Sequence, residues 1–181
     1  GMGLVLDIVP NHMGAGPTNP YWMDVLTFGR QSPYARWFDL DWAAEGAARG
    51  GRIVLAVLGD EPDAAIARDE LGVALRDGSL VVTYYDNVFP VDPRTAHRLF
   101  AFEHEVALPA DDAAALLGVR DALFPAGGEA LGIDAARDAV RALAELAGRS
   151  PAVREYVDRT LAAFTAGDAG RYRMRALLDL Q

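Results

Sequence analysis

Apolar residues in the first half of the chain form short runs that are typical of strands. Residues 4–9 are apolar except for Asp7, which is the pattern of a parallel strand covered on both faces. Residues 52–58 (RIVLAVL) form a second, β-branched run. Strand-like segments also flank Asp77-Gly78, a pair that supplies the positive φ angles of a tight hairpin turn. This half of the chain therefore predicts a small sheet with one hairpin.

Polar residues followed by proline mark two of the helix starts that we expect. Asn19-Pro20 precedes a short helix over residues 21–28, and Ser32-Pro33 precedes a single turn. Further along the chain, apolar residues recur at i, i+3 and i+4, which is typical of amphipathic helices. The resulting helices are expected over residues 61–71, 94–105, 111–117, 134–147, 150–164 and 170–180.

The second half of the chain differs from the first, because residues 94–181 contain no convincing strand. The expected fold class is therefore α+β, with a small sheet near the N-terminal half and a mainly helical C-terminal half. With 51% hydrophobic and 24% charged residues, the composition is that of a folded globular protein.

Charge and cysteine content exclude several classes of partner. A formal net charge of -9 repels phosphate backbones and anionic lipid headgroups, so neither nucleic acid nor a membrane is expected as a partner. No apolar run is long enough to span a bilayer. The chain has no cysteine, which excludes disulfides and thiolate metal sites and is typical of a cytoplasmic protein.

The first apolar run carries polar residues that need an explanation. An unpaired Asp7 carboxylate in such a strand would be costly, so this residue needs a partner or a task. Asn11 and His12 lie where the strand ends, which is where barrels and doubly wound sheets build their sites. Alternatively, Asp7 caps a turn and His12 satisfies loop carbonyls. The residues alone leave both interpretations open.

Aromatic residues are concentrated after this run. Their flat faces suit the apolar C–H faces of sugar rings, but a small satellite core that holds the loop together would use the same residues. For Trp37 and Phe38 we favour the core, whereas for Tyr34 and Trp22 both interpretations stay open. The group consists of Tyr21, Trp22, Tyr34, Trp37, Phe38 and Trp42.

Other ionisable residues do not form a recognisable catalytic or metal-binding pattern. Hydrolysis of a glycosidic bond requires two carboxyl groups that face each other across a cleft. Helix starts and solvated faces explain most of the acidic pairs. His97 and His104 lie seven residues apart without a matching carboxylate pattern, so no metal is predicted. The acidic pairs are Asp39/Asp41, Asp60/Glu61, Glu103/Glu105 and Asp111/Asp112.

Residues 7–12 (DIVPNH) resemble the first signature region of the α-amylase family of glycoside hydrolases and transglycosylases. In that family this stretch is the third strand of a (β/α)8 barrel and its C-terminal end. Residues 29–42 (GRQSPYARWFDLDW) resemble the segment that follows. Together with RIVLAVLG, the hairpin and VTYYDNVFPV, their order is similar to a large insertion in the members that convert the reducing-end α-1,4 link of maltooligosaccharides to an α,α-1,1 link.

The resemblance implies an intramolecular transglucosylation on a maltooligosaccharide, with retention through a covalent glycosyl-enzyme and without a cofactor. It implies that His12 hydrogen-bonds the glucose next to the scissile bond, that Asp7 orients His12, and that Asn11 holds the strand–loop junction. In many α-amylases the equivalent asparagine also ligates calcium. No second set of ligands accompanies Asn11 here, so the resemblance adds no metal.

The family's nucleophilic aspartate, acid/base glutamate and stabilising aspartate come from later barrel strands, and their signature regions are absent from these 181 residues. We therefore expect an inactive fragment that shapes the substrate cleft. Residues 1–13 would be the barrel strand, 14–93 an inserted subdomain and 94–181 its helical part. The alternatives are a fragment of another α-amylase-family hydrolase or transferase, and a stand-alone carbohydrate-binding or structural module. An exposed strand edge over residues 4–9 would also favour self-association.

Overall fold

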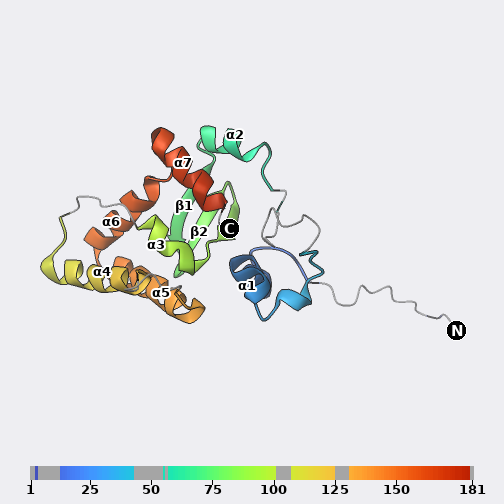
Figure 1. Cartoon of the computed structure of the whole chain (residues 1–181), viewed down its shortest axis with the longest axis horizontal. Coiled ribbons are helices and arrows are strands. Elements are labelled where there is room, and N and C mark those ends of the chain that lie inside the picture. The colour runs from blue at the N-terminus through green and yellow to red at the C-terminus, as the bar shows by residue number, and fades with distance from the viewer. Residues whose placement is uncertain are drawn as a thin grey trace.

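The computed structural model describes residues 3, 13–42, 55, 57–100, 107–124 and 131–179. Over these residues the chain combines helices with one three-stranded antiparallel sheet, and its C-terminal half is mainly helical (Figure 1). The prediction of an α+β fold is confirmed. No helix in these ranges is long and apolar enough to cross a membrane.

The sheet is a meander of β1 (Leu71–Arg76), β2 (Ser79–Tyr84) and β3 (Asn87–Pro90). Asp77 and Gly78 connect β1 to β2 with φ angles of 48° and 76°, so the predicted hairpin is confirmed. The second hairpin, between β2 and β3, was not predicted, because its turn has no glycine to mark it.

The apolar run over residues 52–58 does not join the sheet where it is described. Leu55, Val57 and Leu58 have no strand pairing, so the prediction of a strand is wrong for these residues, while residues 52–54 and 56 lie outside the described ranges. Directly after the run, the Gly59 N–H donates to the Tyr84 hydroxyl at 3.0 Å. The backbone at Gly59 therefore meets a side chain at the end of β2 and makes no ladder pairing.

The next helix is shorter than expected. The sequence predicts a helix over residues 61–71, whereas α2 spans Pro62–Ala67. Asp69 then adopts a positive φ of 55°, which a helix cannot contain, and Leu71 begins β1. The transition from helix to strand therefore takes only a few residues.

Two long helices of the C-terminal half agree well with their apolar spacing. α5 spans Ile133–Arg149 and buries Ala136, Val140, Leu143 and Ala147, as predicted. α6 spans Pro151–Ala162 and begins at Ser150, whose Oγ accepts the Val153 N–H. Ser150 Oγ also donates to Asp112 Oδ2 at 2.6 Å and so links α6 to α4 (Ala110–Leu123).

The remaining helices differ from prediction at their ends. In place of a helix over residues 94–105, the described residues form a 3-10 turn, Pro93–Thr95, and α3 (Ala96–Leu99), while residues 101–106 lie outside the described ranges. α7 spans Gly167–Leu178 and begins before the predicted residue 170. A Cβ on Gly170 would lie 2.9 Å from the carbonyl carbon of Thr165, so the tight turn before α7 requires a glycine there.

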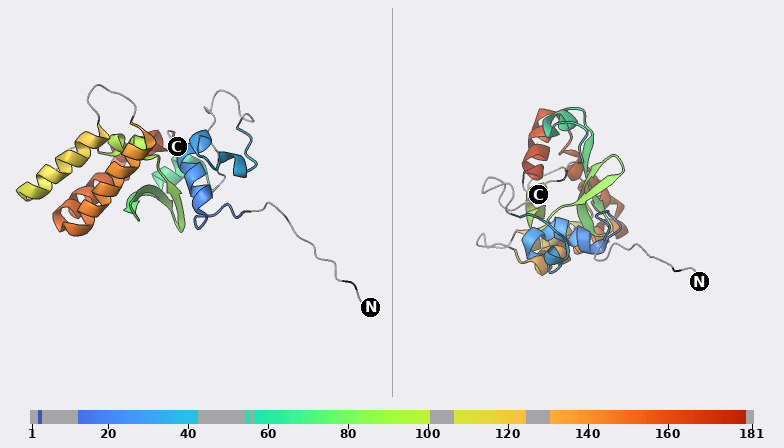
Figure 2. Two further views of the ribbon diagram at one scale, coloured as in Figure 1. Left: turned by 90° about the horizontal axis from the view of Figure 1, so that it is seen from below. Right: turned by 90° about the vertical axis from the view of Figure 1, so that its right-hand side faces the viewer.

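The core lies between the sheet and the C-terminal helices. β1 packs against α6, β2 packs against α5, and α2 packs against α7. α4 and α5 run side by side beneath this layer (Figure 2). One continuous cluster of buried residues therefore joins the sheet to the helices, with its fully buried side chains including Leu80, Leu99, Leu143, Leu146, Met174, Val153 and Val157.

Candidate functional site

Two of the five residues that the sequence proposes for substrate binding fall within the described ranges. These are Trp22 and Tyr34, which belong to the segment over residues 13–42. Asp7, Asn11 and His12 lie outside the described residues, so their proposed roles stay predictions. The site must therefore be built from the segment that follows them.

Asn19 organises the beginning of this segment. Its side-chain oxygen accepts the N–H groups of Tyr21 at 3.0 Å and Trp22 at 3.3 Å, which caps α1 (Pro20–Phe28) as predicted. Its side-chain amide donates to the Gly14 carbonyl at 2.8 Å. One side chain thus joins Gly14, which follows His12 by two residues in the sequence, to the first turn of α1.

Ser32 folds the next stretch of chain back onto α1. Gly29 ends the helix with a φ of 56°, which favours glycine. Two short 3-10 turns follow, at Gly29–Gln31 and Ala35–Trp37. Ser32 is buried; its Oγ donates to Asp24 Oδ1 at 2.6 Å and accepts the Tyr34 N–H at 3.1 Å. These two hydrogen bonds of Ser32, which we call the Ser32 clamp, fix the position of both turns relative to α1.

Tyr21, Tyr34 and Trp37 meet as a result, and we call these three residues the aromatic triad. Their ring centroids are 4.8 Å apart for the two tyrosines, 5.0 Å for Tyr21 and Trp37, and 4.9 Å for Tyr34 and Trp37. The rings are inclined by 55° to 66°, close to the favourable edge-to-face arrangement. Trp37 is 54% exposed and Tyr21 is 39% exposed, so solvent reaches at least these two side chains of the triad.

The sequence favoured a satellite core for Trp37. Its exposure shows that this prediction is wrong. Trp22 has the opposite environment: it is only 7% exposed, and its ring lies 5.0 Å from that of Phe38. Val25 and Phe28 are buried on the same helix. The aromatic residues thus divide into a small packed group around Trp22 and the open triad, and Tyr34 belongs to the triad.

Two arginines connect this segment to the rest of the molecule. The Arg137 guanidinium, from α5, lies 4.9 Å from the centre of the Phe28 ring and 3.6 Å from the Asp24 carboxylate. Arg94 Nη1 donates to Gln31 Oε1 at 2.7 Å. Hydrogen bonding to Asp92 raises the pKa of Arg94, so its guanidinium stays charged. Polar and cation–π contacts therefore help to hold the segment against the rest of the described molecule, residues 57–179, which we call the body.

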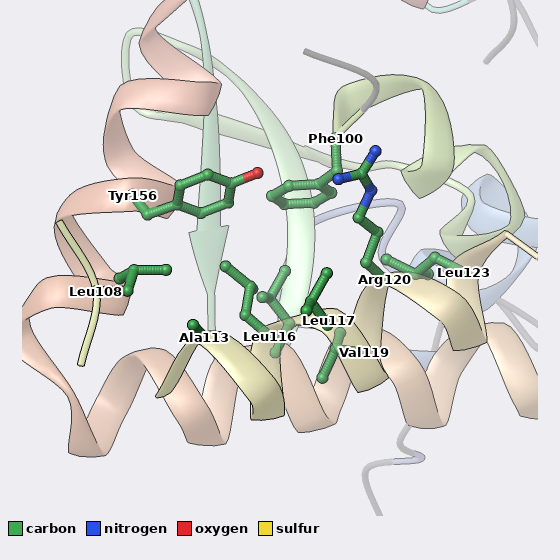
Figure 3. Close-up of a pocket in the computed structure, with 10 residues that line it drawn as sticks. Phe100, Leu108, Ala113, Leu116, Leu117, Val119, Arg120, Leu123 and Tyr156 are labelled. Carbon is green, nitrogen blue, oxygen red and sulfur yellow. The ribbon is translucent and has the colours of Figure 1, made fainter. Parts of the chain in front are cut away.

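A second candidate is an apolar cavity of about 490 Å³ between α4, α5 and α6 (Figure 3). Among the described residues that line it, Arg120 and Tyr156 have the only polar side chains, and the Tyr156 hydroxyl points toward Phe100. No carboxylate lines it, so the described walls offer no acid or base for glycosyl transfer. The described residues that line it are Phe100, Leu108, Ala113, Leu116, Leu117, Val119, Arg120, Leu123, Leu143 and Tyr156.

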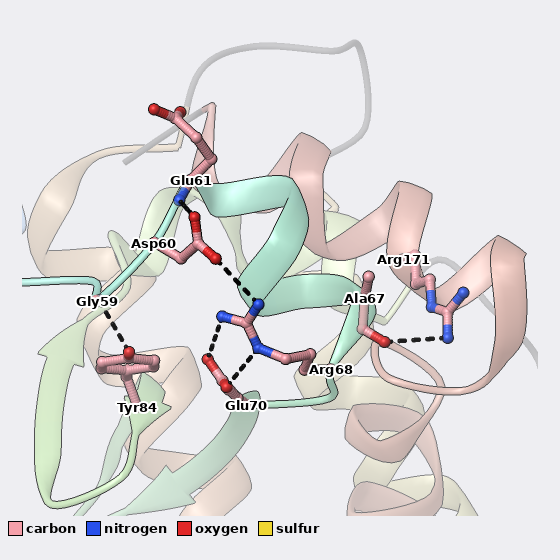
Figure 4. A network of polar contacts seen from close by, with 8 residues as sticks. All are labelled: Gly59, Asp60, Glu61, Ala67, Arg68, Glu70, Tyr84 and Arg171. Atoms are coloured by element: carbon pink, nitrogen blue, oxygen red, sulfur yellow. Dashed lines mark hydrogen bonds and ion pairs between the residues drawn. The ribbon is translucent and has the colours of Figure 1, made fainter.

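A third candidate is a charged network around Arg68, at the end of α2 (Figure 4). Arg68 Nε donates to Glu70 Oε1 at 2.7 Å, and Arg68 Nη1 donates to Asp60 Oδ2 at 3.1 Å. The Glu61 N–H and then Arg68 lower the pKa of Asp60, while the bond from Arg68 lowers the pKa of Glu70. A hydrogen bond to Glu70 raises the pKa of the Tyr85 hydroxyl.

This network ties the chain before α2 to the beginning of β1. Its carboxylates are held in the charged form by their arginine partner, which makes them poor proton donors. Among the described residues, no group of three or more histidine, aspartate or glutamate side chains is placed to hold a metal ion. The network is therefore a structural link, and the aromatic triad is the described feature best suited to contact a ligand.

The chain is similar in sequence to part of two curated proteins. Two proteins of Mycobacterium tuberculosis, from strains CDC 1551 / Oshkosh and H37Rv, are each named "putative maltooligosyl trehalose synthase" and are 42% identical to the chain over 111 residues. The chain is homologous to part of these proteins. The match covers 58% of this chain but only 14% of each mycobacterial protein. No family model matches the chain. No solved structure matches it either.

Proposed function

We propose that this chain is an internal part of a maltooligosyl trehalose synthase and forms one wall of its substrate cleft. The observation that carries the proposal is the 42% identity over 111 residues to proteins of that name, of which the match covers 14%. The likeness of residues 7–12 and 29–42 to the α-amylase family agrees with it. The synthase would place residues 7–12 at the end of the third strand of a (β/α)8 barrel.

The reaction proposed for the parent enzyme is an intramolecular transfer. The reducing-end α-1,4 bond breaks, and the rest of the maltooligosaccharide becomes covalently bound to a carboxylate nucleophile. The anomeric hydroxyl of the released glucose then attacks this glycosyl-enzyme, gives its proton to the acid/base carboxylate and forms the α,α-1,1 bond. No water is consumed overall, so a closed cleft that excludes water favours transfer over hydrolysis.

This chain would supply substrate contacts and no catalytic carboxylate. His12 would donate a hydrogen bond to the glucose next to the scissile bond, Asp7 would orient His12, and Asn11 would hold the strand–loop junction. The resemblance places the nucleophile, the acid/base and the stabilising aspartate on later strands of the parent.

A product assay on the longer protein that contains this sequence tests the proposal. Maltopentaose should lose its reducing end without release of glucose, and a His12→Ala variant of the same protein should have kcat/KM lowered by about 100-fold, the scale of one lost hydrogen bond at a reacting centre. This chain alone should convert nothing. Release of glucose and shorter maltooligosaccharides by the longer protein would instead indicate a hydrolase of the same family.

The alternative from another class is a stand-alone carbohydrate-binding module, and the open aromatic triad is the observation that favours it. Affinity separates the two. A wall of a divided cleft should bind maltooligosaccharides weakly, with a Kd of about 1 mM or above, because it buries only part of the ligand. A Kd of about 1 μM for this chain alone would favour the module.

A further inference from the structure

The geometry points to the aromatic triad of Tyr21, Tyr34 and Trp37 as a glucose-stacking surface for the maltooligosaccharide. The inference rests on the proposed function for the identity of the sugar. It assigns ligand contacts to two residues, Tyr21 and Trp37, that sequence reasoning did not propose as substrate-binding. It also makes Tyr34 part of the same surface as these two rings.

The chemistry of the triad matches a glucose unit. Each ring combines an apolar face with a polar tip, since the tyrosines end in hydroxyl groups and the indole of Trp37 carries an N–H. A glucose unit has apolar C–H faces surrounded by hydroxyl groups. Stacking on the faces and hydrogen bonding at the tips would therefore use both parts of the sugar. The 54% exposure of Trp37 leaves the largest of the three rings open for this contact.

The triad is also preorganised. Its three rings contact one another at 4.8 to 5.0 Å, and the buried Ser32 clamp holds the backbone of Tyr34 against Asp24 on α1. Asp24 in turn lies 3.6 Å from Arg137 on the body. A ligand that stacks on these rings would not have to order them first, which lowers the entropic penalty of binding.

The position of the triad in the chain connects it to the signature. Asn19 bonds Gly14 with its amide nitrogen and Tyr21 with its amide oxygen, so the first ring of the triad is held near the chain that leads from His12. In the sequence, the triad therefore follows closely on the residues whose resemblance implies a glucose contact. A sugar chain is the occupant that this continuity favours.

Other exposed aromatic residues lack these properties and serve as controls. Tyr172 on α7 is 78% exposed and has no aromatic partner in the described structure. Tyr85, in the turn after β2, contacts Tyr84 at 4.8 Å, but its hydroxyl is engaged by Glu70. Neither position combines several open rings, so exposure alone does not predict a sugar site.

Titration of this chain with maltopentaose, followed by NMR at the tryptophan indole N–H groups, tests the inference. The Trp37 signal should shift in a saturable manner with a Kd of about 1–10 mM, while the buried Trp22 signal should move little. Trp37→Ala should weaken binding at least about tenfold, and Trp37→Phe, which keeps a ring, should retain part of the affinity. Tyr172→Ala is the matched control and should leave the Kd unchanged.

The inference is overturned if the Trp37 signal does not respond up to about 50 mM maltopentaose, or if Tyr172→Ala lowers the affinity as much as Trp37→Ala. Its failure can be distinguished from that of the proposed function. A longer protein that forms the α,α-1,1 link, combined with no response at Trp37, refutes the triad alone. A response at Trp37, combined with a longer protein that only hydrolyses maltopentaose, supports the triad and refutes the synthase.

Discussion

The segment over residues 13–42 and the body of the molecule are stabilised by different interactions. In the body, a single apolar core joins the sheet to α5 and α6, and side chains such as Leu143 and Val157 are almost completely inaccessible. The segment buries only a few apolar residues around Trp22 and depends on polar bonds, among them the 2.6 Å bond from Ser32 to Asp24. It contacts the body where α1 packs against β3, and also through Arg94 and Arg137.

This difference separates the part that determines the fold from the part that presents ligand-binding groups. A ring that fills a core cannot also stack on a sugar, so the aromatic faces that remain open are those held by other means. In the segment, hydrogen bonds and contacts between rings position the triad, and Trp37 and Tyr21 stay exposed. Binding groups on irregular chain, carried by a rigid scaffold, are a common arrangement in proteins.

The largest expected effect is the loss of stability when truncation of a buried leucine creates a new cavity in the core of the body. Leu143 on α5 is 1% exposed within the core, so Leu143→Ala should lower the free energy of unfolding by about 2–5 kcal/mol, measured by urea denaturation. Leu117→Ala on the neighbouring α4 is the control, because Leu117 is 56% exposed and its truncation should change stability by only about 0.5 kcal/mol. Equal losses for the two variants would contradict the assignment of the core.

Much of the fold could be predicted because its signals are local. Asn19-Pro20 and Ser150-Pro151 start helices where predicted, since a side-chain cap and a preset φ act within one turn. Asp77-Gly78 makes the hairpin for the same reason. The run over residues 52–58 has the composition of a strand, but pairing depends on a distant partner, and its described residues have none in the sheet.

The site was less predictable than the fold, because it depends on tertiary contacts. Tyr34 and Trp37 are three residues apart at one 3-10 turn, but Tyr21 lies on the separate helix α1, and only the fold-back through Gly29 and Ser32 brings its ring to the other two. Composition therefore indicated an aromatic group but could not separate the buried Trp22 from the exposed Trp37. The Ser-Pro pair was the available signal, since it predicted the turn that carries Tyr34.

A smaller and more local effect should follow from breaking the clamp in the segment. Ser32→Ala removes the donor to Asp24 and the acceptor for the Tyr34 N–H, and we expect a loss of about 1–3 kcal/mol. Unlike the change at Leu143, it should also weaken maltopentaose binding in the folded protein and alter the near-UV circular dichroism of the triad. Ser32→Thr, which keeps the hydroxyl, is the control. An unchanged near-UV spectrum in Ser32→Ala would show that the clamp does not position the rings.

The smallest effect is expected at the Arg68 network, which serves neither the core nor the triad. Asp60 and Glu70 have pKa values below their ordinary values of 3.8 and 4.5, so they stabilise the fold above those pH values and lose this contribution as the pH falls through their lowered pKa values. Arg68→Gln should raise both pKa values toward 3.8 and 4.5, measured by NMR titration of the carboxyl carbons. Because these groups are exposed, stability at neutral pH and maltopentaose binding should change little.

The pKa of Glu70 should rise more than that of Asp60, because Arg68 is the main cause of the shift at Glu70, whereas the Glu61 N–H remains in place at Asp60. The opposite order would show that the arginine contacts do not set these pKa values.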